Sequence, residues 1–263
     1  MGPSHIAILS RALESCRTFL FNRGYTVQML LDFQEVEPLL ESCQKEVTPF
    51  FKTCFFDFNA HNGFCHAAYQ DGRPVSFYCS QLFDTGGLSY LEYHRRQLER
   101  IYGPDCPIDR SWACPPMEQI VGPVIYSGDA LNVPGSRSLK ESMLRLRALA
   151  KMNLYASLLS WPGAQASVGL ARASHVSKGL GNAYGAFHTY PYATRWIKPP
   201  SDRLQDDVFL FSWQADILYQ AQIDALDLEQ EASGQPKAMS ERIELAGYND
   251  TSAPQLLNGS RVN

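Results

Sequence analysis

The chain opens with apolar residues at helical spacing and then turns to strand-like segments. Residues 5–22 carry one apolar stripe, which predicts an amphipathic helix that packs against the domain it precedes. Gly24 ends this helix, so residues 25–31 are expected to form a first strand. Residues 34–45 are expected to form the helix after that strand.

Residues 64–83 give the clearest hairpin pattern in the chain. Two alternating segments flank Asp71-Gly72, a dipeptide favoured in two-residue turns because both central positions need a positive φ. Residues 88–102 then predict a helix, and a Pro-rich stretch follows at 103–116. A tight antiparallel hairpin is therefore expected before a largely helical segment.

The rest of the chain is organised around a predicted strand, loop and helix at residues 119–152. The strand runs over 120–126 and resumes over 130–133. Ser138 and Glu141 fit a capping box, in which the Ser138 hydroxyl accepts from the Glu141 amide and the Glu141 side chain reaches back. Unpaired amides and the helix dipole at such a point favour a phosphate. The alternative is a well-capped structural helix that binds no ligand.

The second half of the chain continues with mixed elements. Residues 154–159 form an unbroken apolar run, which predicts a buried strand. Residues 165–178 predict a helix that Gly169 weakens. Alternation over 207–213 indicates a strand, and residues 216–226 are expected to form a closing helix.

Composition and charge narrow the class of protein. With 263 residues, 45% hydrophobic and 19% charged, the chain is expected to bury one large core or two small ones. A net charge of −4 argues against a general nucleic-acid binder. No run approaches the ~18 apolar residues of a membrane helix, and no leader segment is recognisable, so a cytoplasmic protein without a membrane partner is expected.

The cysteines and histidines give no pattern typical of a metal site. Seven cysteines occur without a C-x-x-C pair, which predicts free thiols in a reducing compartment. His61, Cys65 and His66 lie close in sequence, but no second dense cluster accompanies them. No metal is therefore expected.

Two segments resemble the acetyl-coenzyme A core of the GNAT N-acetyltransferase superfamily. These are GPVIYSGDALNVP at 122–134, followed by Arg137 and the amphipathic helix, and AYGAF at 183–187. The similarity covers the order of elements over roughly residues 25 to 220, and motif detail only over 119–190. It implies a mixed α/β fold with a mostly antiparallel sheet flanked by helices.

The same resemblance implies a division of the chain. Residues 1–24 would be an N-terminal helical extension, and residues 25–226 the GNAT-like domain. A helical insertion would occupy about 84–117. Residues 227–263, rich in polar residues, Gly and Pro, are expected to form a partly disordered tail.

The resemblance implies that an amine attacks the thioester carbonyl of acetyl-CoA or another acyl-CoA. The acceptor would be the amine of a small molecule or of an amino-acid-like compound. A homodimer is one possible oligomeric state. The backbone of the fourth strand would face pantetheine, and the loop after it the pyrophosphate. The residues implied for these contacts are Leu131, Asn132, Val133, Arg137, Ser138 and Lys140.

The sequence departs from the family pattern at three points. The loop glycines of the family fall on Ser138 and Lys140, and its usual tyrosine falls near Gly181. Tyr184 is the candidate acid for the leaving thiolate, and its alternative is an ordinary strand-entry aromatic. Glu118 is the candidate base, and its alternative is an exposed strand-end carboxylate. These departures leave open a catalytically inactive GNAT-fold protein that binds a ligand or a partner.

Overall fold

The structure is a computed structural model that describes residues 1–134, 138–201, 203, 205 and 207–233, with side chains through residue 226. Residues 1–225 form one compact unit. From residue 226 the described chain is the end of helix α8 (Gln214–Ser233). The predicted tail beyond residue 233 lies outside the described residues.

Seven strands of the described residues form one sheet in the order β1-β2-β3-β4-β5-β7-β6. Neighbouring strands are antiparallel except β4 and β5, which run parallel. The expected mixed α/β fold with a mostly antiparallel sheet is confirmed. The strands are β1 (Thr26–Leu30), β2 (Gly63–Gln70), β3 (Arg73–Ser89), β4 (Val121–Asn132), β5 (Ala166–Arg172), β6 (His188–Tyr190) and β7 (Asp207–Trp213).

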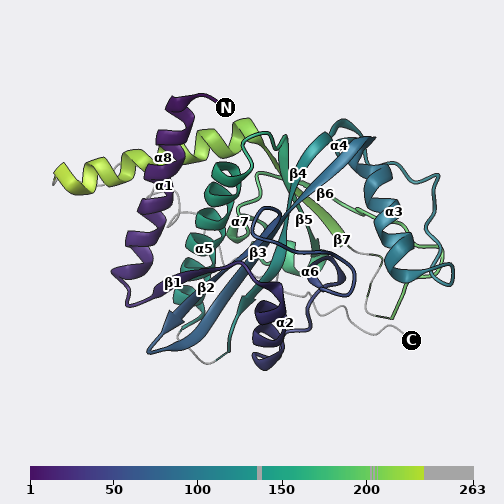
Figure 1. Cartoon of the computed structure of the whole chain (residues 1–263), viewed down its shortest axis with the longest axis horizontal. Helices are drawn as coiled ribbons and strands as arrows, with labels where there is room; N and C mark the ends of the chain where they lie inside the picture. The colour runs from purple at the N-terminus through teal and green to yellow at the C-terminus, as the bar shows by residue number, and fades with distance from the viewer. Residues whose placement is uncertain (135–137, 202, 204, 206, 234–263) are drawn as a thin grey trace, which may run out of the picture. The chain divides into compact units, whose positions relative to one another are not determined.

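Helices cover both faces of this sheet (Figure 1). On one face α1 (Pro3–Phe21) runs beside α5 (Leu139–Ser160), and they share an apolar cluster with the start of α8. A second apolar cluster on the other face holds α2 (Phe33–Ser42), η1 (Pro49–Phe51), α3 (Tyr90–Tyr102) and α4 (Pro115–Gln119). The short helices α6 (Ala173–Val176) and α7 (Leu180–Ala183) lie between β5 and β6 in the chain.

Two predicted elements are wrong. Residues 154–159 are not a strand but the last part of α5, where almost every side chain is buried. A helix buried on all sides shows an unbroken apolar run, as a buried strand does. Residues 166–172 of the predicted helix 165–178 are strand β5, and the helical part is limited to α6.

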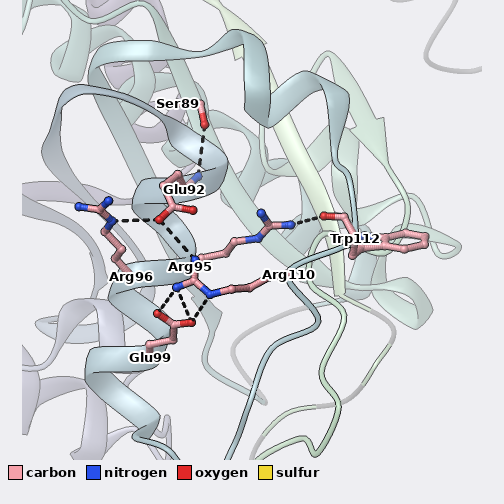
Figure 2. A network of polar contacts seen from close by, with 7 residues as sticks. All are labelled: Ser89, Glu92, Arg95, Arg96, Glu99, Arg110 and Trp112. Carbon is pink, nitrogen blue, oxygen red and sulfur yellow. Dashed lines mark hydrogen bonds and ion pairs between the residues drawn. The ribbon is translucent and has the colours of Figure 1, made fainter.

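The stretch of the predicted insertion, about 84–117, begins with the end of β3, which continues to Ser89. A network of polar contacts then connects α3 to the loop before α4 (Figure 2). Ser89 caps α3 by accepting from the Glu92 amide at 3.3 Å, and Arg110 donates to both oxygens of Glu99 at 2.8 and 2.6 Å. These exposed ion pairs hold the loop against α3, but each adds little to the free energy of unfolding.

Among the described residues, no helix is both long and apolar enough to cross a membrane. All seven cysteines carry free thiols, and Cys16, Cys65, Cys79 and Cys114 are buried.

Candidate active site

A cleft of about 340 Å³ lies where β4 and β5 separate. The two strands pair from Val124 with Ala166 to Tyr126 with Val168. Beyond this pair Gly169 lies against the backbone of β4, and a Cβ at Gly169 would be 2.7 Å from the Ser127 carbonyl oxygen. The strands therefore touch closely at the floor of the cleft and leave space above it.

A bulge in β4 forms one wall. Phe77 pairs with Leu131 and Cys79 with Gly128, so β4 carries an extra residue between these pairs. Asp129 is one of the two residues between Gly128 and Leu131 in this bulge. Its φ of 46° lies in the left-handed region, which Asp and Asn tolerate better than most residues. The bulge turns the Asp129 side chain toward the loop that follows α2.

Asp129 is a buried carboxylate with specific partners. It is 4% exposed and lines the cleft. Its two oxygens accept from the Thr48 amide at 3.2 and 3.0 Å, and the Lys45 ammonium lies 3.1 Å away. Burial raises the pKa of Asp129 above its ordinary value, while Lys45 and Thr48 oppose this effect. Asp129 can therefore hold a proton more readily than an exposed aspartate.

Asp129 was not predicted from the sequence, because residues 127–129 have the composition of a break between two extended segments. The available signal was that extended character resumes at once after the break, which is typical of a bulge inside one strand.

A second candidate group is Tyr184, which follows α7. Tyr184 lines the cleft together with Gly185 and Ala186. The Tyr78 hydroxyl donates to the Tyr184 carbonyl oxygen at 2.9 Å, which fixes this turn on β3. Burial raises the pKa of the Tyr184 phenol, so the group keeps its proton at neutral pH. The predicted position of Tyr184 at the site agrees with the cleft, and its role as an acid stays a prediction.

The lining comes from both faces of the sheet. Lys45, Thr48 and Pro49 belong to the loop between α2 and η1. Tyr78 and Tyr184 pack with the apolar cluster of α1 and α5 on the other face. Elements on both sides of the sheet therefore contribute side chains to this cleft.

The end of β4 differs from the expectation. The residues of β4 that line the cleft are 127–130 rather than 131–133. The Val133 amide already donates to the Val75 carbonyl at 3.0 Å, and the Asn132 side chain accepts from Ser76 at 2.9 Å. Asn132 also accepts from Arg145 at 3.2 Å, and Arg145 is fully buried. Val133 and Asn132 thus hold the sheet together at this point.

The start of α5 forms half of the predicted capping box. The Ser138 hydroxyl accepts from the Glu141 amide at 3.3 Å. The Glu141 carboxylate accepts from the Tyr25 hydroxyl at 3.4 Å instead of reaching back. Leu139 is 78% exposed and is not a core residue, and Lys140 is also exposed. Arg137 lies outside the described residues.

Glu118 lies on the exposed side of α4, before β4 begins. It is not among the described residues that line the cleft. Glu118 and Tyr184 therefore do not share the cleft, whereas Asp129 and Tyr184 both line it. Within the described part of the chain, no group of three or more His, Cys, Asp or Glu side chains is placed to hold a metal ion.

Comparisons with known proteins give structural likeness only. No family model and no curated protein matches the chain. The chain resembles Arabidopsis thaliana NAA60 solved with acetyl-CoA, at 12% identity and a TM-score of 0.42, covering 73% of this chain and 99% of that one.

Two other similar structures are also acetyltransferases. A Drosophila melanogaster polyamine N-acetyltransferase that forms N-acetylagmatine has 15% identity and a TM-score of 0.42, covering 72% of this chain and 99% of that one. The enzyme AAC(6')-Ib, solved with an aminoglycoside and acetyl-CoA, has 10% identity and a TM-score of 0.36, covering 75% and 96%. Because these TM-scores lie below 0.5, the likeness concerns the fold alone, and we infer the chemistry of this chain from its cleft.

Proposed function

We propose that this chain is a divergent member of the GNAT superfamily that transfers an acyl group from acyl-CoA to the amine of a small molecule. The observation that supports this most is the cleft between β4 and β5, whose lining includes a buried carboxylate, that of Asp129, and a partly buried phenol, that of Tyr184. Acyl transfer to an amine needs a base for the nucleophile and an acid for the leaving group, and Asp129 and Tyr184 are of those types.

The proposed reaction is one displacement at the thioester carbonyl carbon. The amine nitrogen bonds to this carbon, the carbon–sulfur bond breaks, and coenzyme A leaves as a thiolate. Asp129 takes the proton that the amine loses, and Tyr184 gives its proton to the thiolate. A carboxylate has about four lone-pair positions. Thr48 and Lys45 use part of them, so Asp129 can still accept from an amine.

Binding of the two substrates is assigned to opposite faces of the sheet. We place the acyl-CoA on the face of α5, where Ser138 and Lys140 at the helix start, with Arg137 before them, would contact the pyrophosphate. The acceptor is placed on the face of α2, beside Asp129 and Lys45. An acetyl donor is the simplest choice, and no metal takes part in this scheme.

Asp129→Asn tests the proposed base. Asn tolerates the positive φ at this position, so the bulge should persist. We expect acetyl-CoA-dependent thiol release with an amine panel to fall by roughly 10²- to 10⁴-fold, with acetyl-CoA binding retained. In the parent enzyme the rate should fall with decreasing pH through the pKa of Asp129, because protonation removes the base.

Glu118→Gln decides between the two carboxylates. Because Glu118 is exposed outside the cleft lining, its variant should keep parental activity. Loss of activity in Glu118→Gln with full activity in Asp129→Asn would reverse the assignment. A parent protein that binds no acetyl-CoA in calorimetry would contradict the acyltransferase proposal and favour the inactive binding protein.

A further inference from the structure

A row of buried polar side chains crosses four adjacent strands beneath α5. His66, Ser80, Ser127 and Ser167 lie on β2, β3, β4 and β5, which are neighbours in that order. Asn153 of α5 contacts the row from above, since its oxygen lies 2.8 Å from His66 Nδ1 and its nitrogen donates to the Ser80 hydroxyl. The Ser80 and Ser127 hydroxyl oxygens are 2.9 Å apart, and those of Ser127 and Ser167 are 3.3 Å apart.

The bonds of this row can all run toward the cleft. The Asn153 oxygen accepts, so His66 must carry its proton on Nδ1. Burial lowers the pKa of His66 to about 4, which keeps the ring neutral. The Asn153 nitrogen donates to Ser80, and either hydroxyl can donate in the Ser80–Ser127 and Ser127–Ser167 contacts. In the arrangement that runs toward the cleft, Ser80 donates to Ser127 and Ser127 donates to Ser167. The Ser167 proton is then left to donate onward.

The row ends in the cleft. Ser127 and Ser167 are 9% and 8% exposed, and both line the cleft beside the Asp129 bulge. The rest of the row is surrounded by the apolar cluster of α1 and α5. Burying a polar group costs free energy unless it is fully hydrogen-bonded. A row that ends at the cleft with a hydroxyl able to donate therefore indicates that this hydroxyl binds a ligand.

We propose that the Ser167 hydroxyl, with Ser127 behind it, donates a hydrogen bond to the thioester carbonyl oxygen of the bound acyl-CoA as negative charge develops on that oxygen. Ser167 is then a catalytic residue, and Asn153 and His66 are positioning residues that act through the serine row. No proton is transferred in this step. The inference rests on the proposed acyltransferase function and adds a donor to it.

Infrared spectroscopy of bound acetyl-CoA with an isotopically labelled carbonyl tests this contact without turnover. A hydrogen bond from Ser167 should shift the carbonyl band of bound acetyl-CoA to lower frequency than in a thioester without a donor. Ser167→Ala should remove that shift, and Ser167→Thr, which keeps a hydroxyl, should restore it. Ser157→Ala is the control, because the Ser157 hydroxyl is also buried but bonds within α5 to the Asn153 carbonyl.

Steady-state kinetics with the best amine provides the second readout. Removal of one oxyanion donor in Ser167→Ala should lower kcat by roughly 100-fold with little change in KM. An ionised Asp at position 153 can only accept hydrogen bonds, so in Asn153→Asp the Ser80 hydroxyl would donate to it and away from Ser127. This variant should therefore lower kcat although the Ser167 side chain is unchanged. Should Asn153→Asp fail to fold, His66→Gln tests the same positioning from the other end of the row.

The outcomes separate this inference from the proposed function. If the parent binds acetyl-CoA but its carbonyl band does not change in Ser167→Ala, the serine donor is wrong and the acyltransferase proposal stands. Equal kcat losses in Ser157→Ala and Ser167→Ala would also overturn the donor, because a general packing defect would explain both. A parent that binds no acetyl-CoA contradicts the proposed function and this inference with it.

Discussion

His66 makes the stability of the protein depend on pH. The ring is 1% exposed, and its pKa falls from 6.5 to about 4 on folding. The unfolded chain therefore binds a proton on this residue between these two values, while the folded chain does not. The contribution of His66 to the free energy of unfolding is fully present above about pH 6.5. It decreases by roughly 3 kcal/mol as the pH falls to about 4.

Urea unfolding of the parent and His66→Gln across this pH range measures the effect. The buried His94, whose pKa is lowered to about 3, contributes to both proteins, so their difference isolates His66. His61→Gln, at an exposed position, should retain the parental slope. Parallel stability curves for the parent and His66→Gln would contradict the prediction.

At the scale of single residues, the sequence predicted positions better than roles. Ser138 caps α5 as its short local pattern predicted. Tyr184 lines the cleft, and its role as an acid stays a prediction. Asp129 and Arg145 were missed, because the bulge at Asp129 and the bonds of Arg145 to Tyr25 and Val75 depend on partners distant in sequence. Glu118 was favoured for its place in the chain, which does not report the direction of a side chain.

At the scale of elements, Gly169 controls how closely β5 approaches β4. A Cβ at this position would lie 2.7 Å from the Ser127 carbonyl oxygen, and a backbone atom cannot move aside as a flexible side chain can. We expect Gly169→Ala to reduce the free energy of unfolding by about 1–3 kcal/mol, as overpacking does. Gly163→Ala, where a Cβ would have no neighbour within 4 Å, is the matched control. Equal urea midpoints for the two variants would contradict the close approach.

Element type was predictable where local chemistry decides it. The Asp71-Gly72 turn and the strand at 207–213 were predicted correctly. The swapped assignments of 154–159 and 166–172 arose because Leu, Ala and Met in α5 are buried on every side, so the amphipathic period disappears. β5 contains Ala and Gly, which have low strand propensity, and its pairing with β4 and β7 overrides that propensity.

At the scale of the whole molecule, residues 1–225 form a compact unit by themselves. A chain ending at Ser233 should therefore melt within about 2 °C of the full-length protein. Differential scanning calorimetry of both proteins at equal concentration measures this. A fall of many degrees would show that residues 234–263 contribute to the stability of the compact unit.

The cleft lined from both faces of the sheet has a consequence for the order of events in turnover. If donor and acceptor approach from opposite faces, neither has to leave before the other arrives, so a ternary complex forms and no acylated protein accumulates. Initial-rate plots should intersect rather than run parallel. Coenzyme A should compete with acetyl-CoA but inhibit noncompetitively against the amine.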